Sequence, residues 1–173
     1  MGYRVAVVGA TGNVGRNVVE QLIARGADVR AVIRDAAKVD LSAGVEVVQG
    51  DLLDVDSLRA AMSGVSTLFL LNGVVADDFT QALITLNVAR EAGIERIVYL
   101  SVIHSDVYVN VPHFAGKFGV ERMIEQTGLP VIVAAFVVST ALRVAQGSAT
   151  VALTTAASLM AGVIAAGDFS PLQ

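Results

Sequence analysis

The stretch that decides the fold lies at the start of the chain, where residues 4–22 read RVAVVGATGNVGRNVVEQL. An apolar β-type run ends at a glycine-rich turn, and the turn opens directly into a helical pattern. In such a unit Gly9 permits the tight turn, Gly12 lets the backbone approach a pyrophosphate, and Gly15 allows close packing of helix on strand. The pyrophosphate would lie at the positive end of the helix that follows. The stretch predicts a dinucleotide site, with a turn made of Gly9, Ala10, Thr11, Gly12, Asn13, Val14 and Gly15.

The composition favours one α/β domain with a sheet covered on both faces. Of the 173 residues, 54% are hydrophobic and 5% aromatic, and the mean hydropathy is +0.67. Aliphatic strands of this kind belong to buried parallel sheets. A net charge of −4 gives no electrostatic footprint for nucleic acid. The absence of cysteine excludes thiol catalysis and is consistent with a cytoplasmic protein, and two histidines without clustered carboxylates predict no metal site.

Strands and helices alternate along the chain. Glycines that follow helical stretches are typical of helix ends, and they are Gly26, Gly64, Gly93 and Gly128. The predicted strands cover residues 3–8, 28–33, 45–49, 66–71, 95–101 and 130–136. The predicted helices cover residues 13–25, 55–63, 77–92, 113–127 and 155–166, with Asp54 as an N-cap and with Asp77 and Asp78 at a helix start. We predict a doubly wound parallel sheet of order 3-2-1-4-5-6, with ligand at the C-terminal ends of strands 1 and 4.

The chain divides into a dinucleotide-binding region, residues 1–136, and a short C-terminal region, residues 137–173, that packs on it or extends it. Residues 144–167 carry no charge. Their polar residues and their many alanines favour a buried or interface helix over a membrane span. Apolar surface on this helix would need cover, so we expect the chain to form a homo-oligomer.

The residues after the second predicted strand indicate which dinucleotide binds. Arg34 can bond a phosphate with two parallel N–H groups, and Lys38 adds a second cation close by. These cations favour NADP over NAD, although Asp35 would repel a phosphate if it turned inward, and an ordinary charged loop is the alternative. Asp51, followed by Leu52, is suited to accept from the adenine amine, and a simple turn aspartate is equally consistent with its position.

Five stretches together resemble the NmrA-like group of atypical short-chain dehydrogenases/reductases; they are GATGNVG at 9–15, VIRD at 32–35, VEVVQGDL at 45–52, RIVYLS at 96–101 and PHFAGKFGVE at 112–121. The resemblance implies a Rossmann-like fold and binding of NADP(H), or of NAD(P)(H). It implies that Lys117 contacts the nicotinamide ribose, and that Arg34 and Lys38 contact the 2′-phosphate. It also brings the cofactor near Leu71, Asn72 and Gly73. Some members of this group reduce quinones or carbonyl-like acceptors, and others are regulators that sense the redox state.

The candidate catalytic pair is His113 and Lys117. Short-chain dehydrogenases usually protonate a carbonyl with the Tyr of a Tyr-x-x-x-Lys pair, and this chain has His-x-x-x-Lys instead. One helical turn brings both side chains to one face, and histidine titrates near neutrality. A capping or packing role for His113 is the alternative. Tyr108 is a second candidate acid, and His104 is expected in a loop.

The C-terminal part departs from the family pattern. In the last predicted strand Ala134 and Ala135 replace the family's Arg-Pro, and the part of the chain that would build the substrate pocket is short. We therefore expect a reduced substrate region, from an internal deletion around residues 143–150 or a shortened chain. The prediction is an NADPH-dependent oxidoreductase that acts on a quinone or carbonyl-type small molecule. The alternative is a non-catalytic NADP(H) sensor with a regulatory protein partner.

Overall fold

The structure, a computed structural model, describes residues 4–35, 41 and 44–127. Several predictions therefore lie outside the described residues: the strand at 130–136, the helix at 155–166, the uncharged segment at 144–167, the helix end at Gly128, and Lys38. In the part of the chain that is described, no helix is both long enough and apolar enough to cross a membrane.

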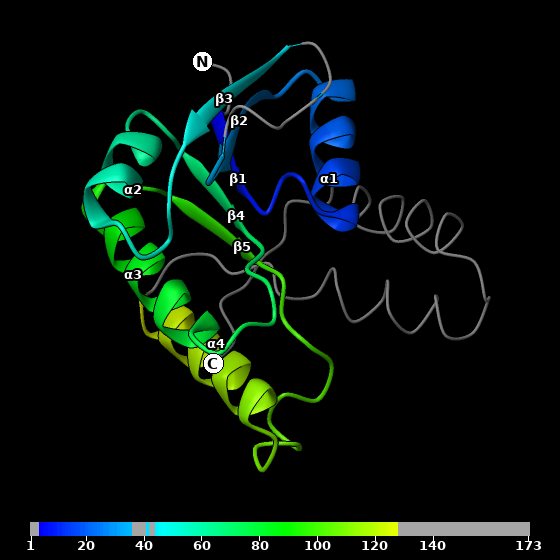
Figure 1. Cartoon of the computed structure of the whole chain (residues 1–173), viewed down its shortest axis with the longest axis vertical. Coiled ribbons are helices and arrows are strands. Elements are labelled where there is room, and N and C mark those ends of the chain that lie inside the picture. The colour runs from blue at the N-terminus through cyan, green and yellow to red at the C-terminus, as the bar shows by residue number, and fades with distance from the viewer. Residues whose placement is uncertain (1–3, 36–40, 42–43, 128–173) are drawn as a thin grey trace, which may run out of the picture. The chain divides into compact units, whose positions relative to one another are not determined.

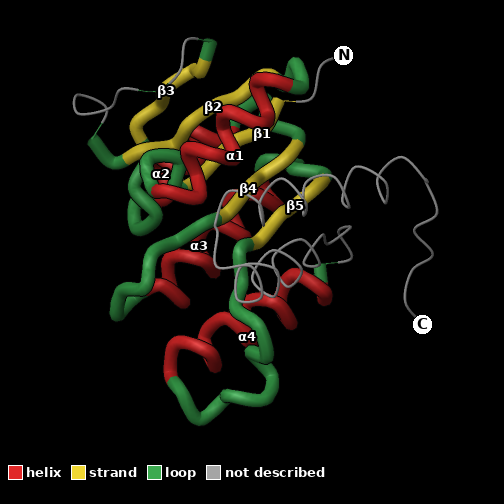
Figure 2. Tube along the Cα trace, turned by 90° about the vertical axis from the view of Figure 1, so that its right-hand side faces the viewer, coloured by secondary structure: helices red, strands yellow, loops and turns green. Residues whose placement is uncertain are grey.

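In the described part of the chain, five parallel strands form one sheet. They are β1 (Arg4–Val8), β2 (Asp28–Ile33), β3 (Val45–Gln49), β4 (Thr67–Leu70) and β5 (Arg96–Tyr99). The strand order is β3-β2-β1-β4-β5, as predicted for these five strands, and Figure 2 shows the strands side by side. The order reverses direction between β1 and β4, whose residues pair in register from Val5 with Thr67 to Val8 with Leu70. In a doubly wound sheet this reversal opens a crevice at the carboxyl ends of the strands.

Among the described residues, three helices connect strands and a fourth follows β5: α1 (Asn13–Ala24), α2 (Val55–Met62), α3 (Asp78–Glu91) and then α4 (Pro112–Gln126). Their ends follow the predicted signals. The Asp54 carboxylate caps α2 by accepting from the backbone N–H groups of Asp56 and Ser57, at 3.1 and 3.3 Å. Gly26, Gly64 and Gly93 all adopt positive φ, between 71° and 76°, as residues that end helices do.

The two faces of the sheet bury different side chains because successive residues of a strand point to opposite sides. Val5 and Val7 of β1 belong to a cluster with Val19 of α1. Ala6 and Val8 belong to a second, larger cluster with residues of α2, α3 and α4. Figure 1 shows α1 on one side of the sheet, with α2 and α3 on the other. The continuous apolar strands predicted this two-sided cover.

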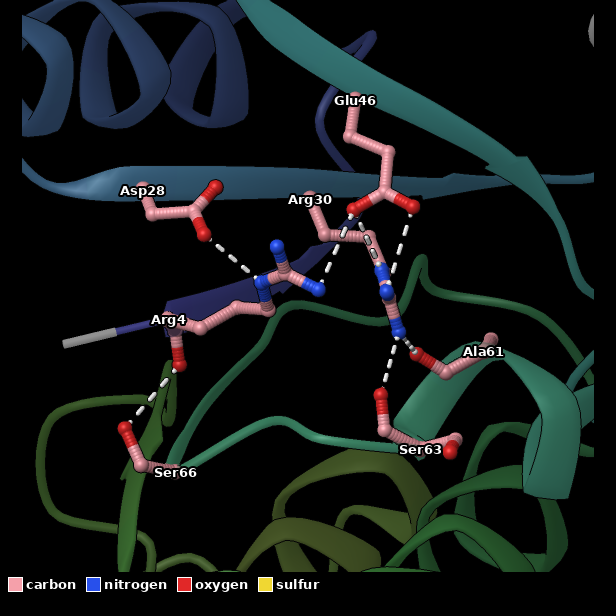
Figure 3. A network of polar contacts seen from close by, with 7 residues as sticks. All are labelled: Arg4, Asp28, Arg30, Glu46, Ala61, Ser63 and Ser66. Carbon is pink, nitrogen blue, oxygen red and sulfur yellow. Dashed lines mark hydrogen bonds and ion pairs between the residues drawn. The ribbon is translucent and has the colours of Figure 1, made fainter. Parts of the chain in front are cut away.

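A buried arginine ties the sheet to α2 (Figure 3). Arg30 of β2 is only 7% exposed. Its guanidinium donates to both carboxylate oxygens of Glu46, at 2.9 and 3.1 Å, and to the carbonyl oxygens of Ala61 and Ser63, at 2.9 and 2.7 Å. The carbonyl groups that end a helix have no partner within the helix. Arg30 therefore satisfies the end of α2 and neutralises a carboxylate of β3 at the same time.

Candidate functional site

A cavity of about 560 Å³ lies at the carboxyl ends of the strands. The residues that line it come from the loops after β1, β2, β3 and β4. Of the predicted site residues, those that line the cavity are Gly9, Thr11, Arg34, Asp51, Leu52, Leu71, Asn72 and Gly73. Those that do not are Ala10, Gly12, Asn13, Val14, Gly15, His113 and Lys117. The structure thus brings the predicted cofactor residues from four separate loops to one hollow, and leaves the predicted catalytic pair outside its lining.

The three glycines of the first turn differ in what constrains them. Gly9 has φ +78°, and a Cβ there would overlap the backbone oxygen of Leu71. A Cβ on Gly15 would overlap the carbonyl group of Gly9, so the close approach of α1 to the turn requires glycine. A Cβ on Gly12 would meet only the Gly9 oxygen, at an ordinary contact distance of 3.5 Å. The fold itself therefore explains Gly9 and Gly15, whereas the need for Gly12 would come from a ligand.

Two arginines line the cavity. Arg34 follows β2 directly and is exposed, which both the phosphate role and the charged-loop alternative require, so its contact with a phosphate stays a prediction. Arg16, in the first turn of α1, was not predicted; its Nε donates to the carbonyl oxygen of Thr11 at 3.0 Å, which holds the guanidinium beside the glycine turn. The signal in the sequence was a cation directly after the third glycine. Asp35, Asp51 and Asp77 also line the cavity, so three carboxylates accompany the two cations among its described lining residues.

Asp51 has a structural role in the turn after β3. Its Oδ1 accepts from the backbone N–H of Leu53 at 2.9 Å, and its own N–H donates to the Ser57 hydroxyl at 3.0 Å. An aspartate that bonds the backbone two residues on stabilises such a turn. The turn role is therefore confirmed, and the contact with adenine stays a prediction for a residue that lines the cavity.

Lys117, on α4, is only 5% exposed. Its ammonium donates to Oδ1 of Asn72 at 3.0 Å and to the carbonyl oxygen of Leu100 at 3.3 Å, and it lies 4.7 Å from the centre of the Tyr99 ring. Burial lowers the pKa of Lys117, and the nearby carboxylates of Asp78 and Glu121 oppose that shift. Lys117 thus reaches the cavity through Asn72, which lines it.

His113 pairs with a carboxylate from another helix. Its Nδ1 lies 2.7 Å from Oδ2 of Asp78, the first residue of α3. The capping alternative for His113 is wrong, because the N-cap of α4 is Val111 and the ring is bonded to Asp78 instead. Asp78 itself is 8% exposed, and its backbone oxygen accepts from Nδ2 of Asn72 at 2.6 Å. The predicted catalytic pair is therefore joined by a chain of contacts through Asp78 and Asn72.

Asp78 is a second residue of this site that the sequence analysis missed. It was interpreted only as a charge at a helix start. Its pairing with His113 spans 35 positions of the chain, and no local pattern signals a contact at that separation.

Glu121, one turn after Lys117, holds the loop between β5 and α4. Its carboxylate accepts from the hydroxyls of Ser101 and Ser105. The same loop contains Tyr108, whose ring is 49% exposed and meets Phe114 edge-on at 5.6 Å. His104 lies in this loop, as predicted, with φ 55°. Among the residues that the structure describes, no three His, Cys, Asp or Glu side chains gather as a metal site would require.

The parallel sheet, the glycine turn and the cavity at the strand reversal define a dinucleotide-binding α/β protein of the Rossmann type. The NmrA-like family profile matches residues 1–156. The chain belongs to the NmrA-like family.

Several relatives of known activity are similar to this chain over part of their length. It is 30% identical over 129 residues to the NAD(P)H azoreductase of Xenophilus azovorans, a match that covers 72% of this chain and 44% of the relative. It is 34% identical over 107 residues to quinone oxidoreductase 2 of Escherichia coli, covering 59% of this chain and 37% of the relative. The chain spans less than half the length of the curated relatives it matches.

Solved structures agree with the fold. The triphenylmethane reductase of Citrobacter sp., solved with NADP(H), superposes with a TM-score of 0.67 and 29% identity, covering 73% of this chain and 47% of that one. NmrA, a negative transcriptional regulator, superposes with a TM-score of 0.65 and 27% identity, covering 76% of this chain and 44% of that one. The neighbours of this fold therefore include both reductases and a regulator.

Proposed function

We propose that the chain binds NADP(H) in the cavity at the carboxyl ends of β1 to β4. The observation that carries the proposal is that eight of the predicted cofactor residues, from the loops after β1, β2, β3 and β4, line this one cavity. The backbone of the turn and the start of α1 would hold the pyrophosphate. Arg34 and Arg16 would meet the 2′-phosphate end of the cofactor, and Asn72 and Gly73 would lie toward the nicotinamide.

We propose further that the protein is an NADPH-dependent reductase of a quinone or carbonyl-type small molecule. The cofactor, when bound, supplies a hydride. Lys117 would fix the nicotinamide ribose through its ammonium and through Asn72, and His113 would donate a proton to the acceptor oxygen. The similarity to an azoreductase and to a quinone oxidoreductase supports this reaction class.

A non-catalytic NADP(H) sensor is the second candidate. The position that carries Tyr in short-chain dehydrogenases is His113 here, and a transcriptional regulator is among the structural neighbours. The loops after β4 and β5 expose large apolar side chains, among them Val74 and Val107, at 74% and 60%. In this alternative the nucleotide would order these loops for a regulatory protein partner.

Calorimetric titration with NADPH, NADP, NADH and NAD tests the cofactor. We expect NADPH and NADP to bind more tightly, and Arg34→Ala to weaken NADPH binding by about tenfold, the effect of losing a charge-assisted hydrogen bond. NADH binding should not change in this variant. Arg25→Ala, which removes the same charge at the far end of α1, is the matched control. Equal affinity of the wild type for NADP and NAD would rule out the phosphate role of Arg34, and no binding of any nucleotide would end the whole proposal.

NADPH oxidation at 340 nm, measured with a panel of quinones and aldehydes, separates the two candidates. Turnover that Lys117→Ala abolishes supports the reductase. Firm nucleotide binding without turnover for any acceptor supports the sensor.

A further inference from the structure

We propose that Asp78 is a positioning residue that holds the neutral ring of His113 in the tautomer with its hydrogen on Nδ1, so that Nε2 is the nitrogen that takes up and releases the exchanged proton. The inference rests on the proposed reductase function. A carboxylate can only accept hydrogen bonds when ionised. At 2.7 Å from Oδ2 of Asp78, Nδ1 of His113 must therefore carry a hydrogen. The proton that the ring can release is then the one on Nε2.

The position of Asp78 is itself fixed from two sides. It begins α3, where a negative charge is stabilised by the helix dipole. Its backbone oxygen accepts from Asn72, whose own Oδ1 accepts from Lys117. Phe79, the next residue, packs against Gly119 of α4, so that any side chain larger than glycine there would press on the ring. Helices α3 and α4 are thereby held close enough for the carboxylate to reach the imidazole.

The reaction step balances with NADPH as the co-reactant. The acceptor carbon gains a hydride and the carbonyl double bond opens. The Nε2–H bond of the His113 imidazolium breaks, and an O–H bond forms on the acceptor oxygen. The neutral ring that remains keeps its hydrogen on Nδ1, and this N–H still donates to the carboxylate of Asp78. Without the carboxylate, the neutral ring would be free to carry its hydrogen on either nitrogen, and fewer molecules would be ready to take up the next proton at Nε2.

Nitrogen-15 NMR of the histidine rings tests the tautomer without any substrate. The chain has two histidines, so His104 in its loop is an internal reference. We expect the neutral His113 ring to be protonated at Nδ1 in the wild type, and Asp78→Ala to shift its population toward the Nε2 form. Asp56→Asn, which removes an exposed carboxylate from α2, should leave both rings unchanged. A wild-type His113 protonated at Nε2 would overturn the proposal.

A double-mutant cycle tests the link to catalysis. We expect Asp78→Asn, which keeps the size of the side chain, to lower kcat by at least tenfold while the Kd for NADPH stays within twofold. In a His113→Gln background the same change should not lower kcat any further. Equal losses in both backgrounds would mean that Asp78 acts only on folding and would overturn the proposal. If the wild type binds NADPH but turns over no acceptor, the reductase function fails, and the NMR result still decides the role of Asp78.

Discussion

Glycine is present at positions 12 and 15 of the turn for different reasons, and substitution of each by alanine distinguishes these reasons. At Gly15 a methyl group would overlap the Gly9 carbonyl, whereas at Gly12 it would make only an ordinary contact. We expect Gly15→Ala to destabilise the fold by about 3 kcal/mol, the scale of overpacking a tight contact. Gly12→Ala should change the free energy of unfolding by less than about 1 kcal/mol.

Nucleotide binding should be affected directly by Gly12→Ala, the variant that changes stability less. Gly12→Ala should fold normally and lose affinity for NADPH, because the new methyl group would occupy the place of the pyrophosphate. Urea denaturation and NADPH titration of both variants measure the two effects. Unchanged NADPH affinity in Gly12→Ala would contradict the assignment of the turn to the cofactor.

At the scale of elements, Arg30 is the link that joins β2, β3 and α2 (Figure 3). Replacing it by Met fills most of the volume but leaves the carbonyl groups of Ala61 and Ser63 without their donor. Unpartnered buried acceptors are costly, so we expect Arg30→Met to lower the free energy of unfolding by about 2–3 kcal/mol. Arg59→Met, on the exposed face of α2, removes two exposed ion pairs, with Asp56 and with Glu91, and should cost much less. Urea denaturation measures both, and equal losses would show that the buried network adds nothing.

At the scale of the whole molecule, the buried Lys117 makes stability depend on pH. Burial lowers its pKa below the value of 10.5 that it has when exposed. Between these two pKa values the unfolded chain binds a proton that the folded chain has released, so stability rises with pH in this window and the gain is complete above 10.5. It is lost as the pH falls through the lowered pKa of the folded state.

The difference in unfolding free energy between wild type and Lys117→Met should therefore grow in favour of the wild type as the pH rises toward 10.5. Urea denaturation at several pH values measures it. Tyr99 acts in the opposite direction: burial raises the pKa of its phenol, so that stability falls once the unfolded phenol ionises. The measurement is best made in Tyr99→Phe, where the opposing contribution of this phenol is absent. A difference that does not vary with pH would contradict the lowered pKa of Lys117.

The sequence by itself determined the order of the five described strands, the glycine turn and eight residues of the cavity lining. These features depend on local patterns: apolar runs, glycines at turns and helix ends, and residues that directly follow a strand. A parallel sheet then brings every loop after a strand to one edge, so Gly9, Arg34, Asp51 and Asn72 meet there without further information.

Only the tertiary structure decided how the polar groups pair. Asn72 and Lys117 are 45 positions apart, and Asp78 and His113 are 35 positions apart. Arg30 is a charge within an apolar strand, and the sequence around it does not predict that its side chain donates to the carbonyl groups at the end of α2. Such contacts depend on the distance and angle between packed helices, which follow from side-chain volumes across the core and not from the pattern of any one segment. Once α3 and α4 lie together, burial requires each polar group to find a partner, and this requirement selects the pairs.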